Sequence, residues 1–213
     1  MEISPFIITF KTAVVATVVT FFLGIFLAYK VVRMKKFKNL ADAIIILPMV
    51  LPPTVVGFFF ILIFGKRSLI GKFLMQFDIN LVFSWQAAVI SAIVVSLPLM
   101  YRTTRGALES LDKNIIYAAQ TLGASNTKIF WKIILPNVRF GILAGTVLAF
   151  TRALGEFGAT IMFAGNIPGK TQTMSTAIYS AVQANDYDLA FQWAAALVIF
   201  SLVFIILLNK LNR

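Results

Sequence analysis

Long apolar runs alternate with short polar segments along this chain of 213 residues. Each run is about long enough to cross a hydrocarbon layer of ~30 Å as a helix that rises ~1.5 Å per residue. The pattern predicts about five membrane-spanning helices, at residues 6–29, 43–64, 83–100, 140–163 and 189–208. We therefore expect an all-α polytopic membrane protein that forms a single domain over residues 1–213.

One polar stretch, residues 104–136, interrupts these apolar runs and has a helical pattern of its own. Asp112 is a candidate N-cap for a first helix that ends at Gly123, a residue that readily adopts the turn conformation needed there. The apolar positions of this helix recur at i, i+3, i+4 and i+7, and they are Ile115, Ala118, Ala119 and Leu122. The pattern predicts an amphipathic helix over 113–122.

A second, shorter helix is predicted directly after the first. Asn126 is its candidate cap, residues 128–135 carry its apolar positions, and Pro136 is expected to end it. The stretch is thus expected to be a helix, a sharp turn and another helix at the membrane surface. Two such helices can rest on lipid headgroups, or they can bind a partner protein.

The composition excludes several classes of chemistry. The chain is 60% hydrophobic and contains neither Cys nor His, which excludes disulfides, thiolate or imidazole metal sites and catalysis by Cys or His. We therefore expect no catalytic residue, metal site or bound cofactor in this chain.

Basic residues are divided unevenly between the two sides that five crossings create. Of 19 Lys and Arg, thirteen fall on one side: Lys30, Arg33, Lys35, Lys36, Lys38, Arg102, Arg105, Lys113, Lys128, Lys132, Arg139, Lys210 and Arg213. Because cytoplasmic loops are rich in Lys and Arg, this side is expected to be the cytoplasm, with the N-terminus outside and the C-terminus inside. The net charge of +11 is thus explained by the basic residues on the cytoplasmic side, and no nucleic-acid partner is expected.

The 104–136 stretch resembles the EAA loop of ATP-binding-cassette (ABC) importer permeases, whose usual spacing is E-A-A-x3-G-x9-I-x-L-P. Ala118, Ala119, Gly123, Ile133, Leu135 and Pro136 fit this spacing, whereas Tyr117 stands where the family usually has Glu. The resemblance implies a type I importer fold whose coupling helix docks to a nucleotide-binding subunit through Tyr117, Ala118, Ala119, Leu122, Gly123, Ile133, Leu135 and Pro136.

The same resemblance implies the rest of the assembly. It would contain a second copy of this chain, two cytoplasmic ATPase subunits that bind the ATP and Mg, and an external oxyanion-binding protein, in the inner membrane of a prokaryote.

Two further segments are similar to the molybdate and sulfate branch of these importers: 152–173 and 47–57. The Gly-Glu-Phe-Gly-Ala-Thr run at 155–160 favours molybdate or tungstate over sulfate. Residues 164–171 also fit a relaxed phosphate-binding loop, A-x4-G-K-T, but such a loop joins a β-strand to a helix, and this stretch follows a predicted span. A chain-reversing turn and an anion-contacting turn remain two interpretations of it.

Two features mark a candidate translocation pathway. Pro52 and Pro53, followed by Thr54, interrupt the second span near the middle of the membrane, and broken spans often line transport paths. Arg152 and Glu156 are spaced i,i+4 within the predicted fourth span, so they are expected to pair from one helix face. A packing kink and a structural ion pair are the alternative interpretations of these features.

The sequence thus favours the permease subunit of an ATP-driven molybdate or tungstate importer. The alternatives are a permease for sulfate or another anion of the same class, an ATP-independent secondary anion transporter, and a self-contained membrane ATPase.

Overall fold

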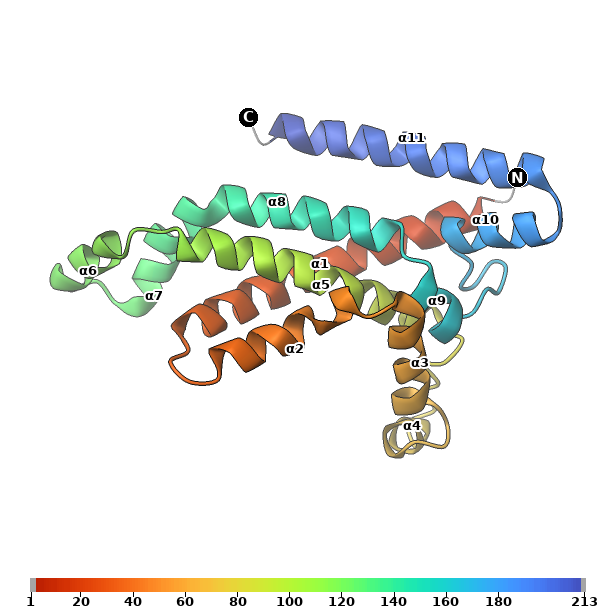
Figure 1. Cartoon of the computed structure of the whole chain (residues 1–213), viewed down its shortest axis with the longest axis horizontal. Coiled ribbons are helices and arrows are strands. Elements are labelled where there is room, and N and C mark those ends of the chain that lie inside the picture. Colours follow the sequence, from red (N-terminus) through yellow and green to blue (C-terminus); the bar gives the residue numbers. More distant parts are fainter. Residues whose placement is uncertain (1–2, 212–213) are drawn as a thin grey trace.

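The computed structural model describes residues 3–211, with side chains described over 3–206, and every element in this part of the chain is helical. The elements are α1 (Ser4–Arg33), α2 (Lys38–Val50), α3 (Pro53–Phe64), α4 (Leu69–Met75), α5 (Trp85–Glu109), α6 (Lys113–Thr121), α7 (Asn126–Ile129), the π-helical segment η1 (Phe130–Ile134), α8 (Leu135–Leu154), α9 (Gly158–Phe163), α10 (Met174–Gln183) and α11 (Tyr187–Leu211). Figure 1 shows them as one elongated bundle.

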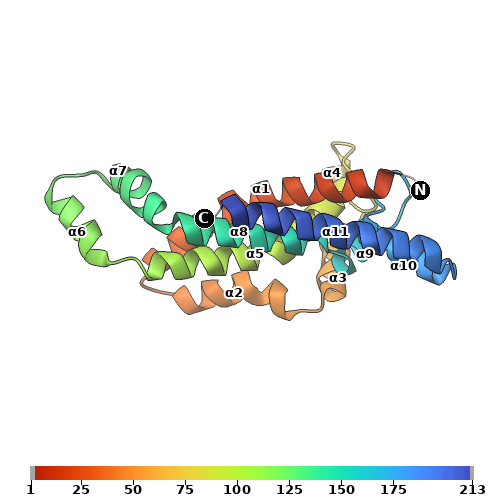
Figure 2. The same ribbon diagram turned by 90° about the horizontal axis from the view of Figure 1, so that it is seen from above.

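The centre of the bundle is formed by α1, α5 and α8, which lie side by side in both views (Figures 1 and 2). Where they meet, Ala13 and Ala16 of α1 and Ala92 of α5 are fully buried, together with Phe150 and Ala153 of α8. Small side chains let helix backbones approach closely, which is the usual way that membrane helices pack. The core is therefore narrow, and many large apolar side chains are left on the outside of the bundle.

The predicted spans are confirmed as helices in three regions, although each helix is longer than its apolar run. The predicted span 6–29 is α1, 83–100 is α5, and 189–208 is α11. Helix α5 continues nine residues past Met100 because the polar residues that follow, such as Arg105 and Glu109, also fit a helix. Within the described residues, four helical stretches are long and apolar enough to cross a membrane, or five if one bent pair counts as a span.

That bent pair corrects the predicted second span, 43–64. It consists of two helices, α2 and α3, that differ in direction by 110°, so α3 projects from the side of the bundle (Figure 1). The predicted interruption itself is confirmed, because Leu51 is extended, Pro52 is the N-cap of α3 and Pro53 is its first residue. A residue before Pro resists the helical conformation, and Pro is well tolerated in the first turn of a helix.

The predicted fourth span, 140–163, is also wrong in its bounds. Helix α8 ends at Leu154, and a break of three residues separates it from the short helix α9. At its other end, Pro136 does not end a helix as predicted but lies in the first turn of α8, directly after η1. The π-helical segment η1 directly precedes α8, so Pro136 falls in the first turn of α8. Its missing N–H is tolerated at that position.

Close packing of α3 on α9 gives a first testable prediction. A Cβ added to Gly57 would lie 2.7 Å from the Met162 Cβ and 2.9 Å from the Ala159 carbonyl oxygen. Gly57→Ala should therefore push the two helices apart at a cost of about 1–3 kcal/mol, and lower the melting temperature by roughly 3–10 °C. The control is Gly106→Ala in α5, where an added Cβ meets nothing within 4 Å and should stabilise the protein. Thermal unfolding in detergent measures both melting temperatures. Equal shifts for Gly57→Ala and Gly106→Ala would contradict this packing.

Candidate functional site at the α6–α7 loop and the α2–α3 break

The first helix predicted within 104–136 is present as α6, and it projects with α7 beyond one end of the bundle (Figure 1). The prediction of a second, separate helix over 128–135 was wrong, because α7 ends at Ile129 and continues through η1 into α8. Asp112 caps α6 as predicted, since its carboxylate accepts from the Asn114 amide at 2.9 Å. Gly123 follows the end of α6 with a φ of +75°, the left-handed conformation that favours glycine. The second cap is Ser125, which accepts from the Lys128 amide, so the prediction of Asn126 was wrong by one position.

The residues of the EAA-like spacing separate into two sets. Tyr117, Ala118 and Leu122 are exposed, and Leu122 most of all at 87%. Ala119 is buried and packs with Ile134 in the same apolar cluster. We refer to the exposed set as the Tyr117–Ala118–Leu122 surface, although Tyr117 also lines a pocket with Tyr29 and Arg33 of α1. Ala119 fixes α6 to the bundle.

The other residues of this spacing do not share that surface. Ile133 and Leu135 are half-buried against the cluster that holds Ala119, and Pro136 is exposed in the first turn of α8. Gly123 lies beside the surface, where an added Cβ would meet nothing within 4 Å. Its role is therefore to allow the turn after α6.

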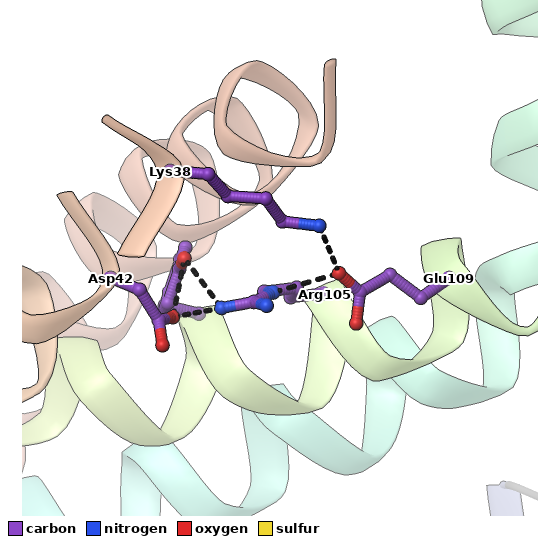
Figure 3. A network of polar contacts seen from close by, with 5 residues as sticks. Lys38, Asp42, Arg105 and Glu109 are labelled. Atoms are coloured by element: carbon purple, nitrogen blue, oxygen red, sulfur yellow. Dashed lines mark hydrogen bonds and ion pairs between the residues drawn. The ribbon is translucent and has the colours of Figure 1, made fainter. Parts of the chain in front are cut away.

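Sequence reasoning missed a polar network that joins α2 to α5 (Figure 3). Arg105 lies between two carboxylates: its Nη1 donates to Asp42 and its Nε donates to Glu109 at 3.0 Å. Lys38 also contacts Glu109 at 2.8 Å, and the Tyr101 hydroxyl donates to Asp42 at 2.9 Å. The signal was present in the spacing, because Lys38 and Asp42, and Tyr101, Arg105 and Glu109, recur every four residues and so share helix faces.

This network should be measurable as coupling between helices. Because the Arg105 side chain is only 21% exposed, Arg105→Gln should lower the free energy of unfolding by about 1–2 kcal/mol. In a double-mutant cycle with Asp42→Asn, the double variant should lose less free energy of unfolding than the sum of the losses in the two single variants. Arg102→Gln is the matched control, since Arg102 lines a pocket together with Asp42 and Arg105 but is exposed. Strict additivity of the Arg105 and Asp42 variants in denaturant unfolding would refute the coupling.

The predicted pair of Arg152 and Glu156 is confirmed, with Nη1 and Oε2 2.7 Å apart. The two residues do not belong to one helix, however, because Glu156 lies in the break between α8 and α9. Its other oxygen accepts from the Ala159 amide at 2.8 Å, so the carboxylate also caps the start of α9. The Glu156 side chain is 2% exposed and that of Arg152 is 33% exposed. The ion pair therefore has one buried partner and one accessible partner.

Arg152 reaches a pocket at the α2–α3 break. The pocket has a volume of about 170 Å³ and is lined by Pro48, Met49, Leu51, Pro53, Val95, Leu99 and Arg152. The structure thus brings together two of the predicted pathway residues, Arg152 and Pro53. Pro52 and Thr54 are exposed beside the pocket and do not line it. A single guanidinium in an otherwise apolar pocket can bind a small anion.

The phosphate-loop-like stretch 164–171 lies between two helices, α9 and α10. Gly165 and Gly169 have φ of +73° and +71°, and the Thr171 hydroxyl accepts from the Ile167 amide at 3.0 Å. These contacts close a compact turn that reverses the chain. A phosphate-binding loop requires a strand before it, and the segment before this turn is a helix.

Comparisons with known proteins agree with this architecture. Residues 20–213 match the family described as the binding-protein-dependent transport system inner membrane component. The molybdenum transport system permease protein ModB of Escherichia coli (strain K12) is 45% identical over 179 residues, 83% of this chain and 78% of that protein. ModB of Haemophilus influenzae is 42% identical over 205 residues, 95% of this chain and 88% of that protein.

A solved bacterial ABC transporter involved in alginate import has the same fold. Its TM-score is 0.84 at 18% identity, over 99% of this chain and 78% of that one. This likeness shows that the two chains share a fold over almost the whole of this chain. From the fold, the match to residues 20–213 and the ModB relatives, we conclude that this chain belongs to the family of binding-protein-dependent transport system inner membrane components, and is a permease subunit.

Proposed function

We propose that this chain is the membrane-spanning subunit of an ATP-driven importer of molybdate or tungstate. The observation that carries the proposal is the identity of 45% and 42% to two molybdenum transport permeases over most of the chain. The accessible guanidinium of Arg152 in the pocket at the α2–α3 break supports an anionic substrate. A tetrahedral dianion matches the several N–H donors that Arg presents in one plane.

The energy would come from separate subunits. Two copies of this chain would bind two ATPase subunits, which hold the ATP and Mg, through the Tyr117–Ala118–Leu122 surface of α6. The three residues of this surface are exposed on or directly after α6, which projects beyond one end of the bundle (Figure 1), and exposed apolar side chains of this kind suit a docking surface. With Tyr117 in the usual place of Glu, docking would rest on shape and apolar contact more than on charge.

The mechanism would be alternating access. ATP binding closes the two ATPase subunits, each α6 moves with its subunit, and the movement passes through η1 into α8, which carries Arg152 at its far end. The pocket would then open to the outside, where a binding protein delivers the anion. The uneven distribution of Lys and Arg supports an N-terminus outside and a C-terminus inside the cytoplasmic membrane.

Transport by reconstituted vesicles tests the substrate. Vesicles that contain the permease, its ATPase and its binding protein should take up labelled molybdate only with ATP inside, and unlabelled tungstate should compete far better than sulfate. Stronger competition by sulfate would assign the chain to the sulfate branch. Uptake that continues without ATP would favour a secondary anion transporter.

A further inference from the structure

An apolar groove on the outside of the bundle is not explained by transport or by ATPase docking. It lies between α1 and η1 and has a volume of about 390 Å³. Its lining is aromatic or aliphatic except for Lys30, and consists of Phe21, Phe22, Ile25, Phe26, Tyr29, Lys30, Phe130, Trp131 and Leu135. A groove of this size and composition fits part of a hydrocarbon chain.

The groove is open on its outer side. Phe22 is 66% exposed, Phe26 is 55% exposed and Trp131 is 59% exposed. All three lie on helical stretches that are long and apolar enough to cross a membrane. Apolar side chains that are exposed at this position contact lipid tails in a membrane, because the hydrocarbon region contains no water.

Lys30 lines one end of the groove, and Arg33 lies beside that end in a neighbouring pocket that shares Tyr29. The Lys30 ammonium lies 5.6 Å from the centre of the Phe26 ring, and the Arg33 guanidinium lies 4.8 Å from the centre of the Tyr29 ring. Arg33 also donates to the Tyr29 hydroxyl, which fixes it near the same end of α1. Tyr and Trp, here Tyr29 and Trp131, are typical of the level of lipid headgroups.

We propose that this α1–η1 groove binds an anionic phospholipid from the leaflet nearest the α6–α7 loop. One acyl chain lies along Phe22, Ile25 and Trp131, and the phosphate contacts Lys30 and Arg33. A lipid with net negative charge is favoured over a zwitterionic one because the headgroup end carries two cations.

The position of the groove lets this lipid influence the coupling of α6 to α8, an inference that rests on the proposed function. The groove is bounded by η1, and η1 is the joint between the α6–α7 loop and α8. π-Helical segments are uncommon and often occur at functional positions. A lipid seated against Phe130 and Trp131 contacts the segment through which movement of α6 reaches α8.

Quenching of Trp131 fluorescence tests the site directly. The full chain is placed in phosphatidylcholine nanodiscs with increasing amounts of phosphatidylglycerol or phosphatidylcholine brominated on the acyl chain. The difference between the wild type and Trp131→Phe isolates the signal of Trp131 from those of the two other Trp residues. We expect half-maximal quenching at a mole fraction about fivefold lower for phosphatidylglycerol, and Lys30→Gln combined with Arg33→Gln should remove this preference.

The matched control is Lys66→Gln combined with Arg67→Gln, which removes the same charge from residues between α3 and α4 and should keep the preference. Equal quenching by the two lipids would overturn the proposal in favour of unselective lipid contact. Absence of quenching by either lipid would also overturn it, because a second copy of the chain would then cover the groove. Circular dichroism of each variant establishes that it is folded, and the quenching assay does not require transport.

Discussion

Leu122→Asp should separate this permease from its ATPase while leaving it folded in the membrane. Leu122 is 87% exposed at the end of α6, so an acidic residue there should change the free energy of unfolding of the isolated chain very little. In the proposed complex the same carboxylate would be buried against an apolar surface of the ATPase. Loss of a central interface residue typically costs about 2–4 kcal/mol, or roughly 30- to 1,000-fold in affinity. Co-purification from detergent, with the ratio of the two subunits measured, detects this change.

Asn39→Asp is the matched control for the added charge. Asn39 is exposed in the first turn of α2, on an element outside the α6–α7 loop. An acid in the first turn of a helix is well tolerated, and the ATPase should co-purify as it does with the wild type. If Leu122→Asp retains a normal ratio of subunits, the Tyr117–Ala118–Leu122 surface is not the docking surface.

Removal of charge at Arg152 should stop transport, provided that Glu156 is neutralised with it. Arg152→Gln alone leaves a buried carboxylate without its cation, which costs about 3–5 kcal/mol and obscures any effect on transport. The double variant Arg152→Gln, Glu156→Gln removes both charges and should fold. Arg152 is the one charged residue among the described residues that line the pocket, and it is the proposed anion contact, so we expect molybdate uptake to fall by about 100-fold or more.

Glu156→Gln alone is the informative comparison. It keeps the Arg152 cation in the pocket, and a Gln oxygen can still accept from the Ala159 amide. Uptake should remain within about fivefold of the wild type, because the pocket cation is retained. If the double variant transports as well as Glu156→Gln, then Arg152 only stabilises the break between α8 and α9.

Much of this architecture could be predicted because it depends on local patterns. The apolar runs predicted α1, α5 and α11, and the Asp112 cap with Gly123 predicted α6, since each depends on a few neighbouring residues. The break after Leu51 was equally local, because consecutive prolines remove backbone donors wherever they occur.

What could not be predicted depends on tertiary contacts. Beyond the 110° bend, α3 packs against α9 through Gly57, and the end of α8 at Leu154 leaves Glu156 free to cap α9. The apolar run of 140–163 gave no sign of that break. Pro136 was misjudged for a related reason, since a Pro between two helical patterns marks either the end of one helix or the first turn of the next. The π-helical segment that decided between them has no pattern of its own.

Contact between α6 and a separate ATPase can be detected by single-cysteine cross-linking. The chain has no Cys, so Ala118→Cys on the exposed face of α6 introduces a unique thiol for a photoactivated maleimide probe in native membranes. We expect Ala118→Cys to capture an ABC ATPase, identified by mass spectrometry, and Gln76→Cys after α4 to capture none. Capture of the ATPase from Gln76→Cys but not from Ala118→Cys would contradict contact through α6.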